Sequence, residues 1–204
     1  MAVDVLSLND LLKDETTKRE EIETLLFSFV SKRHDTSEEA HDVEFFLHTK
    51  AIQFEIMSLS RTYLAMTQYR QTYILGGYFS ISPKPLVIPK KNFSKLSKQL
   101  QKSLMGFGHK TSQENYQIPG YLIGQVGKNF SPDAIACKNV SGALLMDLAM
   151  KKVLEAHALM GGRIVYLECE DSPKLKEFYV SQGFREIEGF TSTNGLQIML
   201  KRLQ

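Results

Sequence analysis

The sequence is poor in the features that mark secreted, disulfide-bonded or membrane-spanning proteins. Its 204 residues include no tryptophan, six prolines and two cysteines, Cys137 and Cys169. Two cysteines cannot build a disulfide framework, and their spacing matches no metal site. No segment approaches the roughly 18 consecutive apolar residues that a membrane helix needs. The first residues carry acidic side chains and no apolar run, so we expect no secretory signal and a reducing, cytoplasmic location.

Acidic residues are absent from one stretch and concentrated in another. Residues 84–110 contain seven lysines and no acid, whereas residues 1–48 contain twelve acids and five bases, although the formal net charge is only +2. Such asymmetry can steer an anionic ligand or RNA toward one side of a protein. Two solvated surfaces are the simpler explanation, so charge alone assigns no partner. The content of 43% hydrophobic and 24% charged residues indicates a globular protein with a core.

Apolar periodicity divides the chain into an N-terminal helical segment, residues 1–58, and a core of mixed composition, residues 59–204. Ser7 or Asn9 is a suitable cap for the first helix, and Thr17 with Glu20 has the spacing of a capping box for the second. Antiparallel strands followed by a strand–helix–strand unit predict an α+β fold with a mixed, mostly antiparallel central sheet of about six or seven strands flanked by helices. We expect helices at 5–14, 18–33, 37–57, 92–105, 141–160 and 172–182, and strands within 61–82 and at 120–129, 163–170, 185–190 and 196–203.

The stretch from Gly120 to Phe184 is the most informative for function. It begins with an apolar strand and leads into a helix that starts at Ser141-Gly142-Ala143. The amides of a helix's first turn have no intrahelical partner and lie at the positive end of its dipole, so they can bind a pyrophosphate. Small residues let phosphates approach the backbone. Simple capping explains the same residues, so the helix start alone does not establish a phosphate site.

A second motif follows, where a strand and an acidic turn lead into Phe178-Tyr179 and then Gly183-Phe184. The spacing Phe-Tyr-x-x-x-Gly-Phe resembles the C-terminal signature of the GNAT superfamily of N-acetyltransferases, and the resemblance covers roughly residues 60–204. The same segments are similar to uncharacterised acetyltransferase-like proteins of Gram-positive bacteria and their mobile elements. The resemblance implies the acyl-CoA N-acyltransferase fold, acetyl-CoA as the acyl donor, no metal, and transfer of the acetyl group to an amine.

The resemblance also implies that Tyr179 is the general acid that protonates the departing thiolate, and a phenol with a pKa near 10 suits that task. The general base is harder to assign, because the strand that reaches Gly127 carries no acid. Glu168 is our candidate, with Glu170 as the alternative on the same strand face, although pairing with lysines would explain both residues as well. Cys169 is not expected to be a nucleophile, since it lies mid-strand with no evident histidine partner.

For the coenzyme, the resemblance implies that the pantetheine arm pairs with the end of the strand at 125–127 and that the pyrophosphate rests on the helix start. The loop departs from the family pattern Arg/Gln-x-x-Gly-x-Gly/Ala. In one register, residues 136–141 lack the basic residue and both glycines, whereas residues 138–143 fit the chemistry better. The residues that we predict to contact the coenzyme are Gln125, Val126, Gly127, Lys128, Lys138, Asn139, Ser141, Gly142, Ala143, Leu144, Ser172 and Phe178.

No motif specifies the acceptor or the partners. We expect a small-molecule or macromolecular amine and no membrane contact, and we leave open a homo-oligomer formed through the apolar faces of residues 5–57. One alternative is a catalytically degenerate module that binds acyl-CoA or a partner protein. Another is a toxin-like acetyltransferase that acts on aminoacyl-tRNA and is held by an antitoxin. RNA contact is the weaker option, because the lysine-rich segment has only Phe93 and Phe107 for stacking on bases.

Three histidines recur every seven residues, at His34, His41 and His48, beside Asp42 and Glu44. On a helix, His41, Glu44 and His48 would share a face, which raises the hypothesis of a metal site. No zinc motif matches, and one helix alone gives incomplete coordination. Solvated helix positions are therefore the better interpretation.

Overall fold

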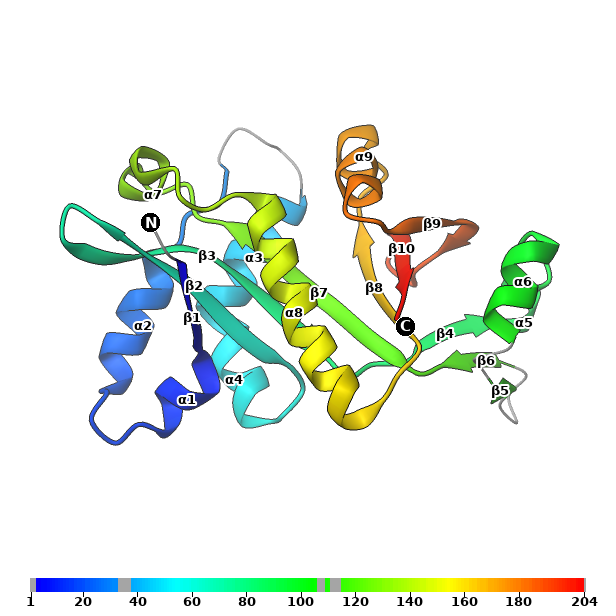
Figure 1. Cartoon of the computed structure of the whole chain (residues 1–204), viewed down its shortest axis with the longest axis horizontal. Coiled ribbons are helices and arrows are strands. Elements are labelled where there is room, and N and C mark those ends of the chain that lie inside the picture. Colours follow the sequence, from blue (N-terminus) through cyan, green and yellow to red (C-terminus); the bar gives the residue numbers. More distant parts are fainter. Residues whose placement is uncertain (1–2, 33–37, 106–108, 111–114, 204) are drawn as a thin grey trace. The chain divides into compact units, whose positions relative to one another are not determined.

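The computed structural model shows two compact units (Figure 1). Unit 1 comprises Met1–Ser82 and Gly124–Met150, and unit 2 comprises Pro83–Ile123 and Lys151–Gln204. Strand β7 (Gly120–Lys128) and helix α8 (Gly142–Met160) each contribute a part to both units. The main sheet has the strand order β1-β2-β3-β7-β8-β10-β9. The residues that the structure describes are 3–32, 38–105, 109–110 and 115–203.

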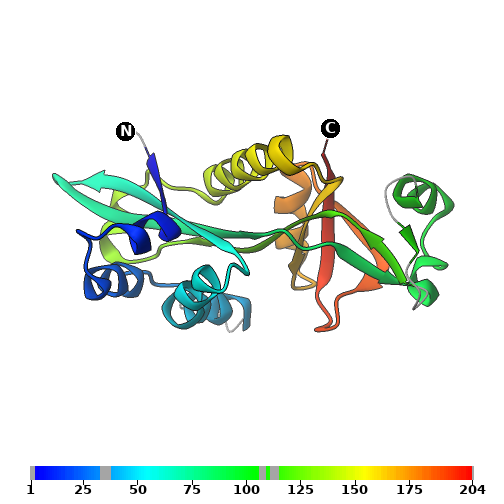
Figure 2. The same cartoon turned by 90° about the horizontal axis from the view of Figure 1, so that it is seen from below.

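Unit 1 is built on an antiparallel sheet of β1, β2 and β3, extended by the second part of β7. The β2–β3 hairpin forms its centre, and β1 pairs with β2 from Val3↔Thr67 to Ser7↔Tyr63. Figure 2 shows the helices of residues 8–56, in blue and cyan, on one face of these strands. The elements of unit 1 besides β7 and α8 are β1 (Val3–Ser7), α1 (Leu8–Lys13), α2 (Arg19–Phe27), α3 (Glu38–Phe45), the π-helical turn η1 (Phe46–Lys50), α4 (Ala51–Ile56), β2 (Arg61–Tyr69), β3 (Thr72–Ser82) and α7 (Pro132–Cys137).

The core of unit 1 lies between these helices and the sheet. Ile22 and Leu26 are four residues apart, so they share one face of α2 and both are buried. They pack in one cluster with Leu64 of β2 and Tyr78 of β3. Each such side chain contributes about 1.5–3 kcal/mol when it leaves water. The apolar faces of residues 8–56 therefore cover the chain's own sheet.

Unit 2 holds the remainder of the main sheet and a second, small sheet. Strand β8 pairs in parallel with the first part of β7 and antiparallel with β10, which pairs with β9. The small sheet has the order β4-β6-β5. The elements of unit 2 besides β7 and α8 are β4 (Leu86–Pro89), α5 (Lys90–Phe93), α6 (Lys98–Met105), β5 (His109–Lys110), β6 (Asn115–Ile118), β8 (Ile164–Cys169), α9 (Pro173–Ser181), β9 (Arg185–Thr191) and β10 (Gln197–Arg202).

The predicted fold class is confirmed, since the main sheet is mixed, has seven strands and is flanked by helices. The predictions for the hairpin, for β7 to α9 and for the closing strand pair are also confirmed within a few residues. Residues 1–58 lie in unit 1 together with β2 and β3, and the division of the chain at residue 58 stays a prediction. Among the described residues, none of the helices combines the length and the apolar character that crossing a lipid bilayer demands.

Five local predictions were wrong. The helix expected at 18–33 is shorter, since α2 ends at Phe27. Residues 3–7 form a strand, so the first helix begins at Leu8 with Ser7 as its cap. The expected capping box fails because the Thr17 hydroxyl bonds Asp14 at 2.8 Å, and α2 starts only after Lys18. The small sheet was missed, since its strands are short and lie among lysines and prolines. The expected helix at 92–105 is instead α5 and α6, separated at Ser94–Ser97.

Candidate functional site

The predicted coenzyme contacts between Gln125 and Leu144 fall in unit 1, and the end of β7 there packs tightly against the helical layer. A Cβ on Gly127 would lie 2.5 Å from Val43 and 2.8 Å from Phe29, so a side chain does not fit without displacement. The side-chain amide of Gln125 donates to a carboxylate oxygen of Asp42 on α3 at 2.8 Å. Gln125 and Gly127 thus have structural partners of their own, and only their backbone edge is suited to a ligand.

Asn129, directly after β7, is the polar centre of this region and is only 1% exposed. Its side-chain oxygen accepts from the amides of Val30 and Ser131, both at 2.9 Å. Its side-chain nitrogen donates to the carbonyls of Leu75 at 2.7 Å and Ser28 at 3.1 Å. One buried amide therefore ties the end of α2, strand β3 and the chain that leaves β7 to one another.

Helix α7 occupies the loop that the sequence left unassigned. The Ser131 hydroxyl caps its first turn, and Pro132 takes the first helical position, where a missing N–H has no cost. The helix ends at Lys138, which adopts a left-handed conformation with φ +58°. The Asn139 side chain then donates to the Thr67 hydroxyl at 3.0 Å, which fastens the connection to β2.

At the start of α8, some of the backbone amides have hydrogen-bond acceptors and others do not. The Ser141 hydroxyl accepts from the Leu144 amide at 3.2 Å, and the Leu145 amide donates to the Ser141 carbonyl at 3.1 Å. Across the part of the chain that the structure describes, the amides of Gly142 and Ala143 have no acceptor. These two amides remain for an anion, whereas the amide predicted at Leu144 is occupied by the chain's own serine.

Two predicted cations flank this connection. The ammonium of half-buried Lys128 lies 5.6 Å from the centre of the Phe130 ring, and Lys138 is exposed. Neither lysine forms an ion pair with another described residue. Lys138 precedes the helix start at Gly142 by four residues, so it adds uncompensated positive charge before the amides of α8, whereas Lys128 ends β7.

Tyr179 lies in unit 2, on a helix whose side chains are all at least partly exposed. Its half-buried ring meets Phe178 at 5.2 Å and Phe184 at 6.4 Å between centroids, both tilted. Its carbonyl accepts the Phe184 amide at 3.0 Å, and Gly183 between them takes φ +83° to close the helix. The Phe-Tyr-x-x-x-Gly-Phe spacing thus reflects a helix end that fixes the tyrosine against β9. Ser172 precedes α9 and its side chain makes no capping bond.

The strand register separates Glu168 from α9. Met199 of β10 faces both Leu167 and Glu186 across the sheet, so these three residues share one face. Lys176 of α9 bonds Glu186 at 2.9 Å, which places α9 on that face. Glu168 follows Leu167 directly and therefore points to the opposite face. The predicted base and the predicted acid do not share a side of the sheet in unit 2.

Glu168 instead belongs to the face of β8 that carries Tyr166. Burial, followed by the charge of Glu168, raises the pKa of the Tyr166 phenol well above its ordinary value. That phenol donates weakly to the Pro85 carbonyl at 3.4 Å. Cys169 ends β8 and is fully buried.

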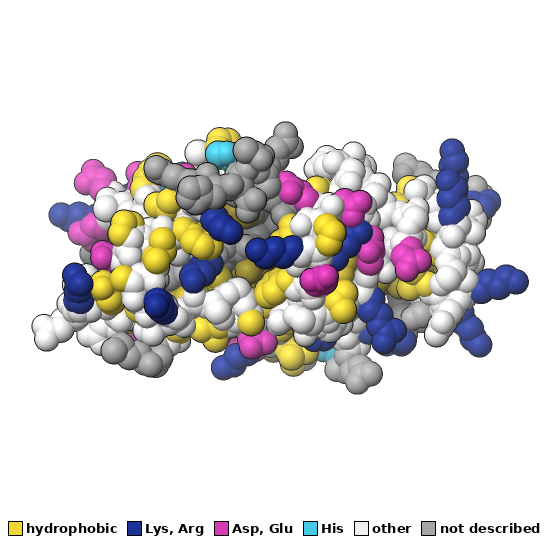
Figure 3. All heavy atoms as spheres, turned by 90° about the horizontal axis from the view of Figure 1, so that it is seen from above, with side chains coloured by type: hydrophobic (Ala, Val, Ile, Leu, Met, Phe, Trp, Pro, Cys, Tyr) yellow, Lys and Arg dark blue, Asp and Glu magenta, His cyan; other side chains and the backbone are white. Residues whose placement is uncertain are grey.

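The remaining candidates behave as ordinary structural or surface groups. A ring nitrogen of His48 lies 3.1 Å from the Phe29 carbonyl, His41 is exposed, and His34 lies outside the described residues. No group of three or more His, Cys, Asp or Glu residues in the described ranges is arranged to hold a metal ion. Lysine and arginine side chains predominate at the end of unit 2 formed by α5 and α6 (Figure 3). Phe93 is buried and stacks on Tyr116 at 3.8 Å, while Phe107 lies outside the described residues.

The sequence interpretation missed Asn129 and α7. Ser131-Pro132 is a helix-start signal, and it could have revealed α7. Nothing in the sequence marks Asn129, because its four side-chain partners come from positions up to 101 residues away.

No protein-family model matches the sequence, and no curated protein matches it. Several solved structures do resemble the whole chain. AtaT complexed with acetyl-methionyl-tRNAfMet superposes with a TM-score of 0.62 at 17% identity, covering 98% of this chain and 95% of that one. A tyrosine-to-phenylalanine mutant of KacT gives 0.60 at 17% identity, covering 99% and 95%. AtaTR bound with acetyl-CoA gives 0.56 at 16% identity, covering 98% and 92%.

These likenesses, at low identity but over nearly the entire chain, establish the fold. The chain has the acyl-CoA N-acyltransferase, or GNAT, fold, as the motif at 178–184 led us to expect. In this fold a parallel strand pair sits within a mostly antiparallel sheet, and here that pair is β7 and β8.

Proposed function

We propose that this chain is an acyl-CoA-dependent N-acyltransferase that moves the acetyl group of acetyl-CoA to an amine. The observation that carries the proposal is the helix start at Gly142 and Ala143, whose two amides are left open at the end of the connection from β7 to α8 in a GNAT fold. A structural neighbour with this fold, AtaTR, is bound with acetyl-CoA. Fold and open amides together favour a bound acyl-CoA over a purely structural helix start.

In the proposed reaction, the coenzyme's pyrophosphate accepts hydrogen bonds from the Gly142 and Ala143 amides, and Lys138 adds charge. The pantetheine arm lies along the backbone of Gln125–Gly127. The amine nitrogen attacks the thioester carbon, and a strand amide near Val126 stabilises the oxyanion. As the C–N bond forms and the C–S bond breaks, Tyr179 donates its proton to the leaving thiolate.

The proton of the attacking amine needs an acceptor, and Glu168 is its candidate carboxylate. The register that sets Glu168 opposite α9 favours loss of that proton to water instead. A pH–rate profile of Glu168→Gln distinguishes the two. If Glu168 is the base, the acidic limb of the profile disappears and the rate falls about 10²–10⁴-fold. If water is the acceptor, the limb persists.

The first test is a thermal-shift titration with coenzyme A and acetyl-CoA. At a ligand concentration a hundredfold above Kd, binding should add about 2.7 kcal/mol of stability. No shift with either ligand at millimolar concentration would refute the proposal. Thiol release over a panel of amines follows, with Tyr179→Phe expected to lower the rate about 10²–10⁴-fold while coenzyme binding stays. Binding without thiol release from any amine would point to the module that binds acyl-CoA without turnover.

A second candidate, a toxin-like enzyme acting on aminoacyl-tRNA, is favoured by the neighbours. AtaT is complexed with acetyl-methionyl-tRNAfMet in one structure and, as a mutant toxin, is bound to the C-terminus of the antitoxin AtaR in another. The expectation that RNA contact is the weaker option therefore finds no support. Transfer of labelled acetyl to charged tRNA, but not to uncharged tRNA, would identify this acceptor. Arrest of growth on expression, relieved by Tyr179→Phe, would support the toxin hypothesis.

A further inference from the structure

Strand β7 has an open backbone edge within unit 1. Among the described residues, its parallel pairing with β8 ends at Leu122↔Tyr166, so the part from Gly124 to Lys128 has no paired strand along that edge. The pantetheine arm is proposed to lie along this edge. A second substrate that reaches the thioester therefore meets the side chains that border the edge on one face of the sheet or the other.

The two faces of the sheet are covered by different helices at this edge. Gly127 faces the helical layer, because a Cβ there would lie 2.5 Å from Val43 and 3.1 Å from Tyr78. Gly77 precedes Tyr78 in β3 and faces the opposite side, where its Cβ would lie 2.8 Å from Leu145 of α8. Figure 2 shows α8, in yellow, on one side of the strands and the blue and cyan helices on the other. An acceptor that approaches from the helical-layer face therefore avoids the open amides of α8 and the coenzyme bound there.

On the helical-layer face, the exposed carboxylate of Asp42 in α3 borders the open edge. Gln125 shares the face of Gly127, two residues further on, and its side-chain amide donates to Asp42 Oδ2 at 2.8 Å. Asp42 forms no ion pair with another described residue. A neutral amide thus orients the carboxylate without cancelling its charge, as a lysine or arginine in its place would.

The backbone next to Asp42 is fixed by two hydrogen bonds. The phenol of fully buried Tyr78 donates to the Val43 carbonyl at 2.5 Å, and the Glu44 carboxylate accepts from the Ser31 amide at 2.6 Å. Burial, and after it the charge of Asp42, raises the pKa of the Tyr78 phenol. The two acids therefore differ in role, since Glu44 holds the fold together and Asp42 faces solvent.

The cation at the end of β7 does not neutralise Asp42. Lys128 follows Gly127 directly, so it belongs to the face that α8 covers, and its ammonium lies 5.6 Å from the centre of the Phe130 ring. An ammonium ion from solvent complements the charge of Asp42 and donates to its oxygens. A neutral hydroxyl group would gain less from this carboxylate, and an anionic acceptor would be repelled.

We propose that Asp42, oriented by Gln125, binds the acceptor as an ammonium ion, so that the second substrate is a primary amine held at the open edge of β7. This inference rests on the proposed function, because it takes the thioester to lie at Gln125–Gly127. Asp42 binds and orients the nitrogen, whereas the group that later takes its proton is distinguished by Glu168→Gln. Free amines and the α-amino group of an aminoacyl-tRNA both present such an ammonium.

The test uses two coenzyme A thioethers whose tails differ in one terminal group. S-(2-aminoethyl)-coenzyme A ends in an ammonium at pH 7, near the position of the attacking nitrogen, and S-propyl-coenzyme A ends in a methyl group. Calorimetric titration of the full chain should give about tenfold tighter binding of the aminoethyl ligand, as one charge-assisted contact predicts. Asp42→Asn keeps an oxygen for Gln125 and should reduce this preference toward unity. Gln125→Leu, which frees the carboxylate to rotate, should reduce it less.

Glu20→Gln removes an exposed acid of α2 and is the matched control, which should keep the wild-type preference. A preference lost equally in Glu20→Gln would show that the general negative charge of residues 1–48 attracts the ammonium, and would overturn the role of Asp42. A preference that persists in Asp42→Asn, or equal binding of both thioethers by the wild type, would overturn this inference and leave the proposed function standing. Failure of the wild type to bind either thioether or coenzyme A would instead remove the proposed function itself.

Transfer of labelled acetyl separates the two sources of the ammonium. A charged tRNA and the corresponding amino-acid amide carry the same amino group, so their rates in the wild type show which source is used. For the acceptor that is acetylated, Asp42→Asn should raise KM about tenfold, with the KM for acetyl-CoA unchanged. An unchanged KM for that acceptor would contradict the contact with Asp42.

Discussion

The connection from β7 to α8 in unit 1 and the helix α9 in unit 2 carry the two halves of the proposed chemistry, and different interactions hold them. The connection is fixed by buried hydrogen bonds to Asn129, which is 1% exposed. On α9, no side chain is fully buried. That helix is fastened at the surface by Lys176, which pairs with Asp171 at 2.6 Å and Glu186 at 2.9 Å.

The difference predicts how each half responds to change. Removing a buried side-chain amide that has all its hydrogen-bond partners costs much stability. Every lost hydrogen bond leaves a polar group unpaired where water cannot reach it. Exposed ion pairs contribute little and are screened by salt. We therefore expect the coenzyme-binding half to be rigid before the ligand arrives. The helix that carries Tyr179 can adjust its position at little cost.

Asn129→Ala should have the largest effect on stability. The substitution leaves the Val30 and Ser131 amides and the Leu75 carbonyl without their hydrogen-bond partner, so the free energy of unfolding should fall by about 3–5 kcal/mol. Urea unfolding followed by circular dichroism measures this change. Coenzyme affinity at a temperature where the variant is folded should also fall, since the connection to α8 loosens.

Two further variants control this result. Asn129→Asp keeps the oxygen that accepts from the two amides. It replaces the nitrogen that donates to the Ser28 and Leu75 carbonyls with a second acceptor oxygen, so it should also destabilise the fold. Asn194→Ala removes an exposed asparagine from the turn before β10 and should change stability by less than about 0.5 kcal/mol. Equal stability of Asn129→Ala and the wild type would show that the connection is not held in the way described.

Gly127→Ala should have the next largest effect. The new methyl group would lie 2.5 Å from Val43 and 2.8 Å from Phe29, which forces the helical layer away from β7. Overpacking of this kind costs about 1–3 kcal/mol. Gly124→Ala in the same strand is the matched control, because its methyl group meets nothing within 4 Å. A thermal melt of the two variants should separate them, and identical melting temperatures would contradict the packing of β7.

The periodic elements could be predicted from the sequence because their signals are local. Residues 141–160 repeat apolar positions at helical spacing, and Gly161 with φ +74° closes the helix, as the paired glycines indicated. The motif from Phe178 to Phe184 likewise located a helix end and the strand after it. These features depend on neighbours within a few residues, which one sequence displays.

The rest depends on contacts between distant segments. Strand β1 has only five residues, three apolar and two polar, which is too short to show a strand pattern. Its pairing with β2 makes it a strand rather than the start of a helix. The role of Asn129 requires Ser28 and Leu75 to be brought beside it by the fold. The sequence could not show that Glu168 and α9 lie on opposite faces of the sheet, because strand alternation indicates which residues share a face but not which helix covers that face.

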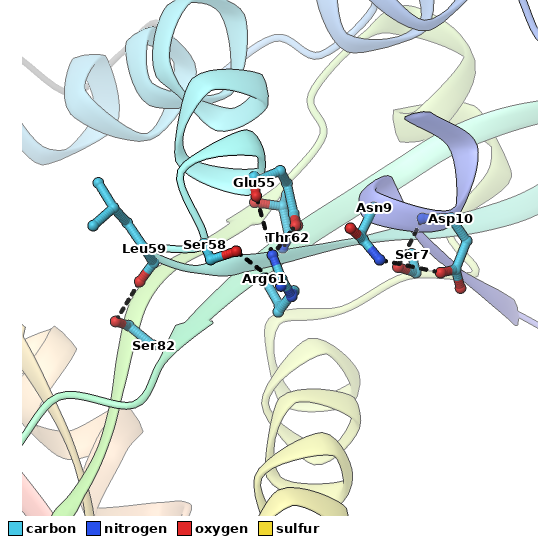
Figure 4. A network of polar contacts seen from close by, with 9 residues as sticks. All are labelled: Ser7, Asn9, Asp10, Glu55, Ser58, Leu59, Arg61, Thr62 and Ser82. Carbon is cyan, nitrogen blue, oxygen red and sulfur yellow. Dashed lines mark hydrogen bonds and ion pairs between the residues drawn. The ribbon is translucent and has the colours of Figure 1, made fainter. Parts of the chain in front are cut away.

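Glu55 is intermediate between Asn129 and Lys176. Its carboxylate is buried in unit 1, as Asn129 is, but it forms an ion pair, as Lys176 does. Figure 4 shows its oxygens directed at Arg61, 2.9 Å away, and at the Thr62 amide. The carboxylate side chain is 1% exposed and that of Arg61 is 39% exposed. Burial raises the pKa of Glu55, against the lowering effects of the Thr62 amide and Arg61. The hydroxyl of Thr62 is buried without a partner among the described residues.

The raised pKa fixes the sign of a pH effect. Because the folded state holds the Glu55 proton more tightly than the unfolded state, stability falls as pH rises from the ordinary glutamate range through the folded pKa. Glu55→Gln removes this contribution, so the stability of the variant relative to the wild type should increase over that pH range. Each unit by which the folded pKa exceeds the unfolded one corresponds to about 1.4 kcal/mol. Urea midpoints at several pH values measure it, and parallel curves would contradict the buried ionisation.

Lys176→Met should have the smallest effect on stability, and it tests directly how weakly α9 is held. Its two carboxylate partners raise the pKa of Lys176 well above its ordinary value, yet Asp171 is 68% exposed and the other two side chains are partly exposed, so water and salt screen the pairs. We expect a drop in Tm smaller than that of Gly127→Ala, and a smaller one still in 0.5 M NaCl, where the Debye length is about 4–5 Å. Under the proposed function, acyl transfer should fall while coenzyme affinity does not, because α9 positions Tyr179 and takes no part in the open amides of α8. If Lys176→Met destabilised the chain as much as Asn129→Ala, α9 would be as rigidly held as the connection after β7, and the contrast between the two halves would disappear.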